Sequence, residues 1–190
     1  MSAMSDHVPS TIVIKQAEAE PQQAEALLDA AFGLDRRTKA SYRLREGSAP
    51  VSGLSFTARE RESGRLVGTI SFWPLRTFPE GVPALLLGPL AVHPDMQRQG
   101  LGAALIGQGL MAAARQGHAL VFLVGDAPYY ARFGFAPVQP FGRLLLPGPF
   151  DPTRLLYREL KEGAMTDKVR GLLLPEWRWQ QALQSRERRA

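Results

Sequence analysis

A short glycine-bearing loop, Gln97-Arg98-Gln99-Gly100-Leu101-Gly102, constrains the fold of this chain more than any other segment. It stands between an apolar segment that ends at Val92 and an alanine-rich segment that runs to Gly117. This order predicts a strand, a loop and a helix whose first turn carries the glycines. The first backbone N–H groups of a helix lack partners within it and lie at the positive end of its dipole. A helix that begins on glycines can therefore bring those N–H groups close to an anionic phosphate.

Neither of the two common nucleotide-binding motifs matches this loop. The dinucleotide fingerprint requires a third glycine three residues after the second, where this chain has Leu105. The P-loop requires a lysine and then a serine or threonine, whereas Gly102 is followed by Ala103. The remaining pattern is Gln97-x-x-Gly100-x-Gly102, which could bind phosphate or serve only as a helix entry with close packing.

A second motif, Tyr129-Tyr130-Ala131-Arg132-Phe133-Gly134-Phe135, follows an apolar run at 119–124. Taken with the glycine loop, it resembles the GCN5-related N-acetyltransferase (GNAT) family, and within it the bacterial YhbS-like branch. In this family a Gln/Arg-x-x-Gly-x-Gly/Ala loop binds the pyrophosphate of coenzyme A, and a tyrosine stands four residues before a Gly-Phe pair. Tyr130 occupies that position here. The resemblance extends from about residue 11 to about residue 161 and is densest between residues 88 and 135.

The resemblance implies one α/β domain with a mixed, mostly antiparallel sheet that is splayed at a central parallel pair and has helices on both faces. We expect this domain at residues 7–165, followed by a C-terminal tail at 166–190 of unknown shape. The residue pattern agrees, with amphipathic helices from Pro21 to Gly33 and from Gly100 to Gly117. Strands are expected at residues 11–15, 54–60, 66–72, 84–92, 119–124 and 154–160.

Pro89 interrupts the expected central strand at 84–92. Because proline cannot donate to a strand ladder, we predict a bulge or a local separation of strands there. The resemblance implies the same outcome, since in this family the strand diverges from its parallel neighbour and the pantetheine arm of acetyl-CoA enters the gap. The free backbone groups, assigned to Leu90 and Val92, would then pair with the amides of the arm and polarise the thioester carbonyl.

The resemblance implies that acetyl-CoA is the co-substrate and that its site is built largely from backbone. The first helical turn after Gly100 would hold the phosphates, and Arg98 could add positive charge. An exposed polar turn is the alternative role for residues 97–99. The predicted cofactor-binding residues are Leu90, Ala91, Val92, Gln97, Arg98, Gln99, Gly100, Leu101, Gly102, Ala103, Tyr130 and Phe133.

The predicted reaction is direct attack of a substrate amine on acetyl-CoA, without an acyl-enzyme intermediate. The chain has no cysteine, which excludes a thioester nucleophile. The resemblance implies that Tyr130 is the catalytic acid that protonates the departing thiolate. A free tyrosine has a pKa of about 10 and so holds its proton at neutral pH. A core tyrosine is the alternative role for Tyr130, and Tyr129 is expected to pack or to contact substrate.

A general base is harder to identify, because residues 84–87 carry no acid. Glu60 and Glu80 are the remaining candidates, whereas Asp126 is expected to cap a helix. A non-catalytic module that binds acyl-CoA as a sensor or partner subunit is therefore the alternative function. The acceptor would be an amine on a small molecule or a protein, and its identity would depend on the loops at 33–53, 74–83 and 139–152.

Composition sets further bounds on a chain of 190 residues, which is long enough for one domain with a sizeable core. A net charge of +5 would permit nucleic-acid binding, but much of the excess lies at residues 185–189 and favours a solvated tail. His7, His93 and His118 lack metal-ligand spacing, so no metal is expected. No apolar run reaches the roughly 18 residues of a membrane span, and no signal-peptide pattern begins the sequence. We therefore expect a cytoplasmic protein without a membrane partner, and a homodimer is compatible with the sequence.

Overall fold

The computed structural model describes residues 8–38 and 40–188. Within them one nine-stranded mixed sheet runs in the order β1-β2-β3-β4-β5-β8-β6, and β9 pairs with β3 and β7 beside this path. Most neighbours are antiparallel, whereas β4 pairs with β5 in parallel, as does β7 with β9. The strands are β1 (Ile12–Gln16), β2 (Ser55–Glu60), β3 (Leu66–Phe78), β4 (Pro83–Val92), β5 (Leu120–Val124), β6 (Ala136–Pro137), β7 (Leu144–Leu145), β8 (Leu155–Glu159) and β9 (Gly171–Pro175).

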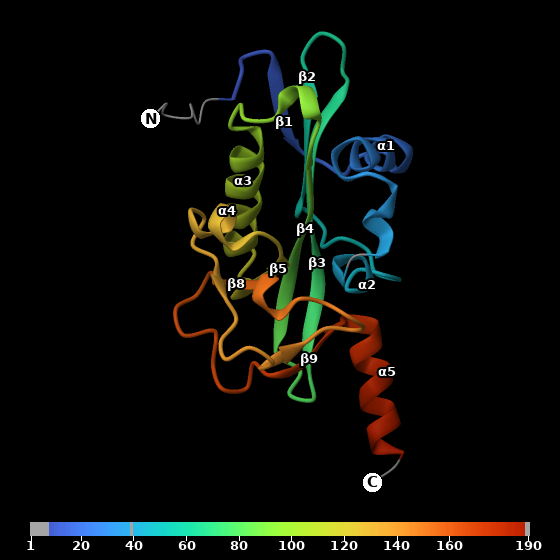
Figure 1. The fold of residues 1–190 in the computed structure, drawn as a ribbon, viewed down its shortest axis with the longest axis vertical. Helices are drawn as coiled ribbons and strands as arrows, with labels where there is room; N and C mark the ends of the chain where they lie inside the picture. The colour runs from blue at the N-terminus through green and yellow to red at the C-terminus, as the bar shows by residue number, and fades with distance from the viewer. Residues whose placement is uncertain (1–7, 39, 189–190) are drawn as a thin grey trace.

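Helices cover both faces of this sheet (Figure 1). On the first face lie α1 (Pro21–Phe32) and α2 (Ala40–Arg43), and on the second lie α3 (Leu101–Arg115) and α4 (Ala127–Ala131). The last helix is α5 (Glu176–Glu187). Helix α3 buries Ile106, Leu110 and Ala113 at helical spacing, and these side chains join the main hydrophobic core against the sheet. The expected α/β architecture is confirmed.

The central strands separate where the sequence predicted a disruption. Pairing between β4 and β5 covers Leu85 opposite Val121 and Leu86 opposite Phe122, although β4 continues to Val92. On its other side, the β3–β4 register shifts between Ile70 and Phe72, so one residue of β3 faces Gly88 and Pro89 of β4. The additional residue on β4 forms a β-bulge, which bends this strand away from a regular ladder. The predicted bulge and the splayed parallel pair are therefore both confirmed.

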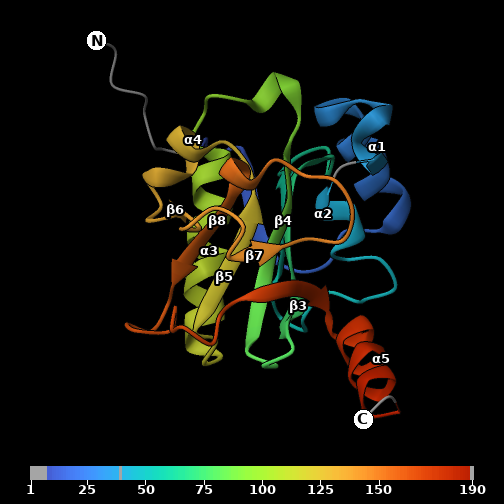
Figure 2. The ribbon, with the colours of Figure 1, turned by 60° about the horizontal axis from the view of Figure 1, so that its bottom comes forward.

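The sheet extends beyond residue 165 into the segment that the sequence analysis treated as a tail of unknown shape. Strand β9 pairs with the end of β3, Leu75 opposite Pro175, and its Leu173 is fully buried. Figure 2 shows this strand, coloured red-orange, leading directly into α5. The indole N–H of Trp177 in α5 donates to the Glu46 carbonyl at 2.7 Å. The segment expected as a tail therefore contributes a strand and a packed helix, while the expected start at residue 7 lies outside the described residues.

His93 and His118 are the histidines that lie within the described residues. His93 accepts a hydrogen bond from the Asp95 backbone N–H through Nδ1 at 3.3 Å, and burial lowers the pKa of His118. His7 lies outside the described residues. Across residues 8–38 and 40–188, no three His, Asp or Glu side chains gather into a potential metal site. In the same part of the chain, no helix is both long enough and apolar enough to cross a bilayer.

Two glycines of α3 provide a test of how tightly the helix packs on the sheet. A Cβ at Gly109 would overlap the buried Phe72 ring, with 2.8 Å to Cζ, whereas a Cβ at Gly107 would meet nothing within 4 Å. Overpacking typically costs about 1–3 kcal/mol, and replacing a helical glycine by alanine gains up to about 1 kcal/mol. We expect Gly109→Ala to lower, and Gly107→Ala to raise, the free energy of unfolding measured in urea. Equal shifts in both variants would contradict this packing.

Candidate active site

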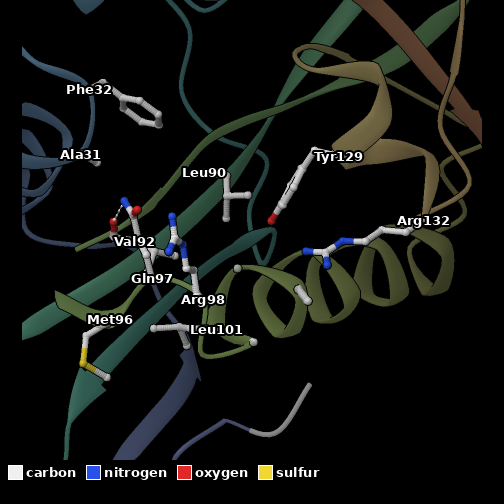
Figure 3. Close-up of a pocket in the computed structure, with 13 residues that line it drawn as sticks. Ala31, Phe32, Leu90, Val92, Met96, Gln97, Arg98, Leu101, Tyr129 and Arg132 are labelled. Atoms are coloured by element: carbon white, nitrogen blue, oxygen red, sulfur yellow. Dashed lines mark hydrogen bonds between the residues drawn. The ribbon is translucent and has the colours of Figure 1, made fainter. Parts of the chain in front are cut away.

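The glycine loop borders a cavity of about 340 Å³ between the end of α1, the end of β4 and the start of α3 (Figure 3). Most of the predicted cofactor-binding residues line it, together with side chains from α1 and α4. The lining residues are Ala31, Phe32, Leu90, Val92, Met96, Gln97, Arg98, Gly100, Leu101, Gly102, Ala103, Tyr129 and Arg132. We call this space the loop cavity.

The loop reaches the cavity through two residues in the left-handed region of the backbone. A 3₁₀ turn at Pro94–Met96 is followed by Arg98 with φ 62° and by Gly100 with φ 73°. Gly100 is the N-cap of α3, and the first intrahelical bond runs from the Ala104 N–H to its carbonyl at 3.0 Å. The N–H groups of residues 101–103 precede that bond and are the ones a helix leaves for another partner. An anion in the loop cavity would meet these groups at the positive end of the helix dipole.

The backbone of β4 also presents hydrogen-bonding groups at this point. The His93 N–H donates to the Val67 carbonyl of the neighbouring strand β3 at 2.8 Å. Because alternate residues of an antiparallel strand point their backbone groups the same way, the backbone N–H and carbonyl of Ala91 also face β3. The backbone groups of Leu90 and Val92 therefore face away from β3, toward the gap that opens as β5 diverges. The Val92 carbonyl accepts a hydrogen bond from the Gln97 amide at 3.4 Å, drawn as a dashed line in Figure 3.

Four of the predicted cofactor-binding residues do not line the loop cavity. The Ala91 side chain is buried on the opposite face of β4 with Leu27 and Leu28, so that only its backbone could contribute. The Gln99 side chain turns back and donates to the Asp95 carbonyl at 3.1 Å. Phe133 packs on the main core and lines neither this cavity nor the next one. Tyr130 lies in the second cavity.

A second cavity of about 430 Å³ adjoins the first, and Phe32 and Leu90 line both. Its apolar walls come from β4, β5 and α1, and its polar groups come from segments far apart in the sequence. The residues that line it are Leu28, Phe32, Arg36, Thr38, Ala40, Ser41, Tyr42, Leu87, Gly88, Pro89, Leu90, Leu123, Val124, Gly125, Asp126, Tyr130, Pro149, Phe150, Asp151 and Arg154. We call it the inner cavity, and the shared wall residue Leu90 places it next to the loop cavity on β4.

The two adjacent tyrosines of α4 serve different cavities. Tyr130 is half-buried in the inner cavity, where its ring packs edge-on against Phe135 with centroids 5.9 Å apart. Burial, with smaller contributions from the nearby Tyr129 and Asp126, raises the pKa of Tyr130 to about 12 against the opposing effect of Arg154. The hydroxyl therefore keeps its proton throughout the neutral range.

Tyr129 instead lines the loop cavity, and a Cβ on Gly102 would lie 3.1 Å from its hydroxyl oxygen. Arg132 lines the same cavity and stacks on the Tyr129 ring at 4.5 Å from its centroid. The sequence analysis missed both as cavity residues. Their spacing of three residues on one helix was a usable signal, since such residues share a helix face.

The structure also locates the candidate bases. Glu60 pairs with Arg65 at 2.6 Å and Glu80 with Arg170 at 3.1 Å, and neither carboxylate lines the two cavities. Asp126 caps α4 as predicted, because its carboxylate accepts the Tyr129 N–H at 3.3 Å. It also lines the inner cavity.

Asp151 is a second carboxylate of the inner cavity, and the sequence analysis missed it. Hydrogen bonds from the Thr153 hydroxyl and backbone N–H hold the pKa of Asp151 below its usual range. A lowered pKa makes this carboxylate a weaker proton acceptor. The two carboxylates give the inner cavity a means of attracting a cationic amine.

Comparison with known proteins agrees with this geometry. Residues 52–137 match the family model of an acetyltransferase (GNAT) domain. YhbS of Escherichia coli (strain K12), named an uncharacterized N-acetyltransferase, is 34% identical over 111 residues, which are 58% of this chain and 65% of YhbS. The aligned segment thus spans less than two thirds of that relative's length.

Two solved structures extend the comparison to the whole fold. The crystal structure of the GNAT family N-acetyltransferase YhbS from Escherichia coli in complex with CoA has a TM-score of 0.73 and 25% identity, covering 92% of this chain and 95% of that one. A GNAT family acetyltransferase from Brucella melitensis in complex with acetyl-CoA has a TM-score of 0.53 and 29% identity, covering 66% and 82%. The sequence motif, the fold and these relatives agree that residues 52–137 form an acetyltransferase (GNAT) domain within a chain that has the GNAT fold.

Proposed function

We propose that this protein is an enzyme that transfers the acetyl group of acetyl-CoA to the amine of an acceptor by direct attack. The observation that carries the proposal is that the two cavities are neighbours, because Phe32 and Leu90 line both. One cavity ends in the N–H groups that begin α3, which suit a pyrophosphate, and the other contains a protonated tyrosine. The CoA and acetyl-CoA complexes of the relatives support the same co-substrate.

In this proposal acetyl-CoA lies along the exposed edge of β4. The pyrophosphate accepts hydrogen bonds from the N–H groups of residues 101–103. The amides of the pantetheine arm pair with the backbone of Leu90 and Val92, and Gln97 must release the Val92 carbonyl where the arm takes its place. The thioester then reaches the wall at Leu90, where an acceptor in the inner cavity can approach it.

The amine nitrogen attacks the thioester carbon, and the C–S bond breaks as the tetrahedral intermediate collapses. The nitrogen gives up its proton to Asp126, directly or through water, and the sulfur leaves as a thiolate. Tyr130 donates its O–H to that thiolate. Because the pKa of Tyr130 is about 12 and an ordinary thiol has a pKa of about 8.5, complete proton transfer from the tyrosine is uphill. Its larger contribution is a hydrogen bond that strengthens as negative charge develops on sulfur.

A non-catalytic acyl-CoA-binding module is the second candidate. It is favoured by the described strand β4, whose residues Pro83–Val92 carry no carboxylate, and by the helix caps that engage Asp126 and Asp151. A weakly placed base would leave the cofactor bound and the amine unreacted.

The two functions differ in a simple assay. The protein is mixed with acetyl-CoA and a panel of primary amines that includes polyamines, amino acids and peptides, and free thiol is followed with a chromogenic thiol reagent. We expect thiol release that depends on both the protein and one class of amine. Tight binding of acetyl-CoA in a calorimeter without thiol release across the panel would overturn the enzymatic proposal and favour the binding module.

A further inference from the structure

A third recess next to the inner cavity contains Arg45, a cation whose guanidinium forms no ion pair or hydrogen bond with the residues that the structure describes, although Glu25 lies near enough to act on it electrostatically. The recess has a volume of about 420 Å³ and shares Tyr42 with the inner cavity. The residues that line it are Glu25, Arg37, Tyr42, Arg43, Arg45, Glu46, Ser48 and Trp73. Because Tyr42 lines both spaces, a ligand in the recess would lie next to an acceptor in the inner cavity.

Arg45 is held in this recess by aromatic rings. Its guanidinium carbon lies 3.8 Å from the centroid of Tyr42 and 5.6 Å from that of Trp73. Its Nη2 atom is buried and has no hydrogen-bond partner among the residues that the structure describes. Burial lowers the pKa of Arg45 to about 10. A buried donor without a partner is costly, and it is the kind of group that a ligand completes.

The other charged groups of the recess are already engaged. Glu25 accepts from both Arg36 and Arg37, and Glu46 accepts from Arg178 at 3.0 Å. The Arg43 guanidinium donates to the carbonyls of Thr38, Pro147 and Pro149. Among the described cations that line the recess, Arg45 is therefore the one whose donors remain available.

We propose that Arg45, which lines the recess beside the inner cavity, forms a carboxylate-binding subsite there through its guanidinium fork. A carboxylate fits the charge, because three arginines and two glutamates line the recess and leave one excess positive charge. A phosphate monoester would bring about 1.5 to 2 negative charges toward the same two glutamates. The planar fork of arginine also matches the two oxygens of a carboxylate.

The binding of a carboxylate at Arg45 does not depend on the proposed function. Only the identity of the molecule that carries the carboxylate rests on that function. An acceptor that carries both an amine and a carboxylate, such as a peptide with a free C-terminus, could extend past Tyr42 from the inner cavity into the recess. A separate small carboxylate could instead bind there beside the acceptor. Both sources require the same contact with Arg45, so the binding test needs no turnover.

The first experiment measures thermal stabilisation by N-acetylglycine, which has a carboxylate and no amine, against its neutral amide. We expect the carboxylate to raise the melting temperature of the parent more than the amide does, since a ligand that binds the folded state stabilises it. Arg45→Met should weaken the binding of N-acetylglycine at least about tenfold, because the charge-assisted hydrogen bonds to its carboxylate are lost. Arg45→Lys keeps the charge without the fork and should bind with intermediate affinity.

Arg37→Met is the matched control, because it removes an exposed cation from the same recess that already pairs with Glu25. It should respond to N-acetylglycine like the parent. The proposal is overturned if the acid and the amide stabilise the parent equally, or if Arg45→Met and Arg45→Lys respond like the parent. These outcomes do not depend on acetyl transfer, so they are distinguishable from a failure of the proposed function.

The source of the carboxylate is found by comparing glycylglycine with glycylglycinamide as acceptors, whose amines have similar basicity. If the acceptor carries the carboxylate, the acid should have the lower KM, and Arg45→Met should remove that difference without changing kcat. If a separate molecule carries it, N-acetylglycine should bind without competing with the amine acceptor. Either result, together with the binding loss in Arg45→Met, supports the subsite.

Discussion

Replacing Gly102 by valine is expected to weaken acetyl-CoA binding at least about tenfold while the fold is retained. Gly102 is the second residue of α3, and a Cβ there would lie 3.1 Å from the Tyr129 hydroxyl, on the wall of the loop cavity. A branched side chain would hold the pyrophosphate away from the N–H groups that begin the helix. A hydrogen bond to a charged group contributes about 1.5–3 kcal/mol, so losing one corresponds to at least tenfold in Kd.

The control for this variant lies in the same helix. Gly107→Val carries the same change in helix propensity, but a Cβ at Gly107 meets nothing within 4 Å and the residue does not line the cavity. Arg98→Ala should weaken binding less than Gly102→Val, because the proposed site is built mainly from backbone. Gly100→Val is a poorer test, since its φ of 73° would strain valine whatever the ligand does. If calorimetry gives Gly102→Val and Gly107→Val the same affinity for acetyl-CoA, the loop is not the phosphate site.

The elements that the sequence predicted well are those whose signals are local. Helix α1 begins at Pro21 and ends at Phe32, before Gly33 with φ 75°, as proline and glycine at those positions indicate. The bulge in β4 was predicted because Pro89 cannot donate a backbone hydrogen bond wherever the strand lies. These signals depend on one residue's covalent chemistry, so they survive without knowledge of the tertiary fold.

The elements that the sequence missed depend on distant partners. Strand β3 was expected to end at residue 72, but it continues through Pro74 to Phe78 and pairs there with β4 and β9. A proline in mid-strand argues against continuation, and β9 alone is too short to show periodicity. Each strand is stabilised by the other, which is a property that neither segment shows separately.

The site divides in the same way. The loop cavity was largely predictable, because its glycines and the helix that follows are contiguous. The inner cavity was not, since its wall combines Arg36, Asp126 and Asp151 from separate loops. Neighbouring residues of a helix point about 100° apart, which is why Tyr129 and Tyr130 face different cavities. The sequence motif pointed to Tyr130 alone, whereas the helix geometry places Tyr129 at the loop cavity and Tyr130 at the inner cavity.

Replacing Tyr130 by phenylalanine is expected to lower kcat about 10²-fold, with acetyl-CoA affinity nearly unchanged. General acid catalysis typically contributes about 10²-fold to 10⁴-fold. The lower end is expected here, because a pKa of about 12 makes Tyr130 a better hydrogen-bond donor to the thiolate than a source of a free proton. Phenylalanine keeps the ring that packs on Phe135, so the fold and the ground-state complex should persist.

Tyr129→Phe is the matched control, and its effect should fall on a different quantity. Its hydroxyl lies at the loop cavity near Gly102, so its removal should weaken acetyl-CoA binding modestly and leave kcat close to that of the parent. Each variant removes one oxygen from the same helix, but the proposed mechanism gives one oxygen a role in the chemistry and the other a role in binding the cofactor. The reverse pattern, in which Tyr129→Phe loses kcat and Tyr130→Phe does not, would show that the reacting sulfur lies against Tyr129.

The pH dependence adds a readout that a purely structural role for Tyr130 would not change. Because the raised pKa of about 12 keeps the hydroxyl protonated up to about pH 11, the kcat ratio of parent to Tyr130→Phe should stay constant from pH 7 to pH 10. A tyrosine at its ordinary pKa of about 10 would instead lose half of its donor by pH 10, and the ratio would fall toward one. A falling ratio would mean that the side chain is more hydrated than its buried position allows. If Tyr130→Phe equals the parent at every pH, water supplies the proton and the tyrosine serves only to shape the inner cavity.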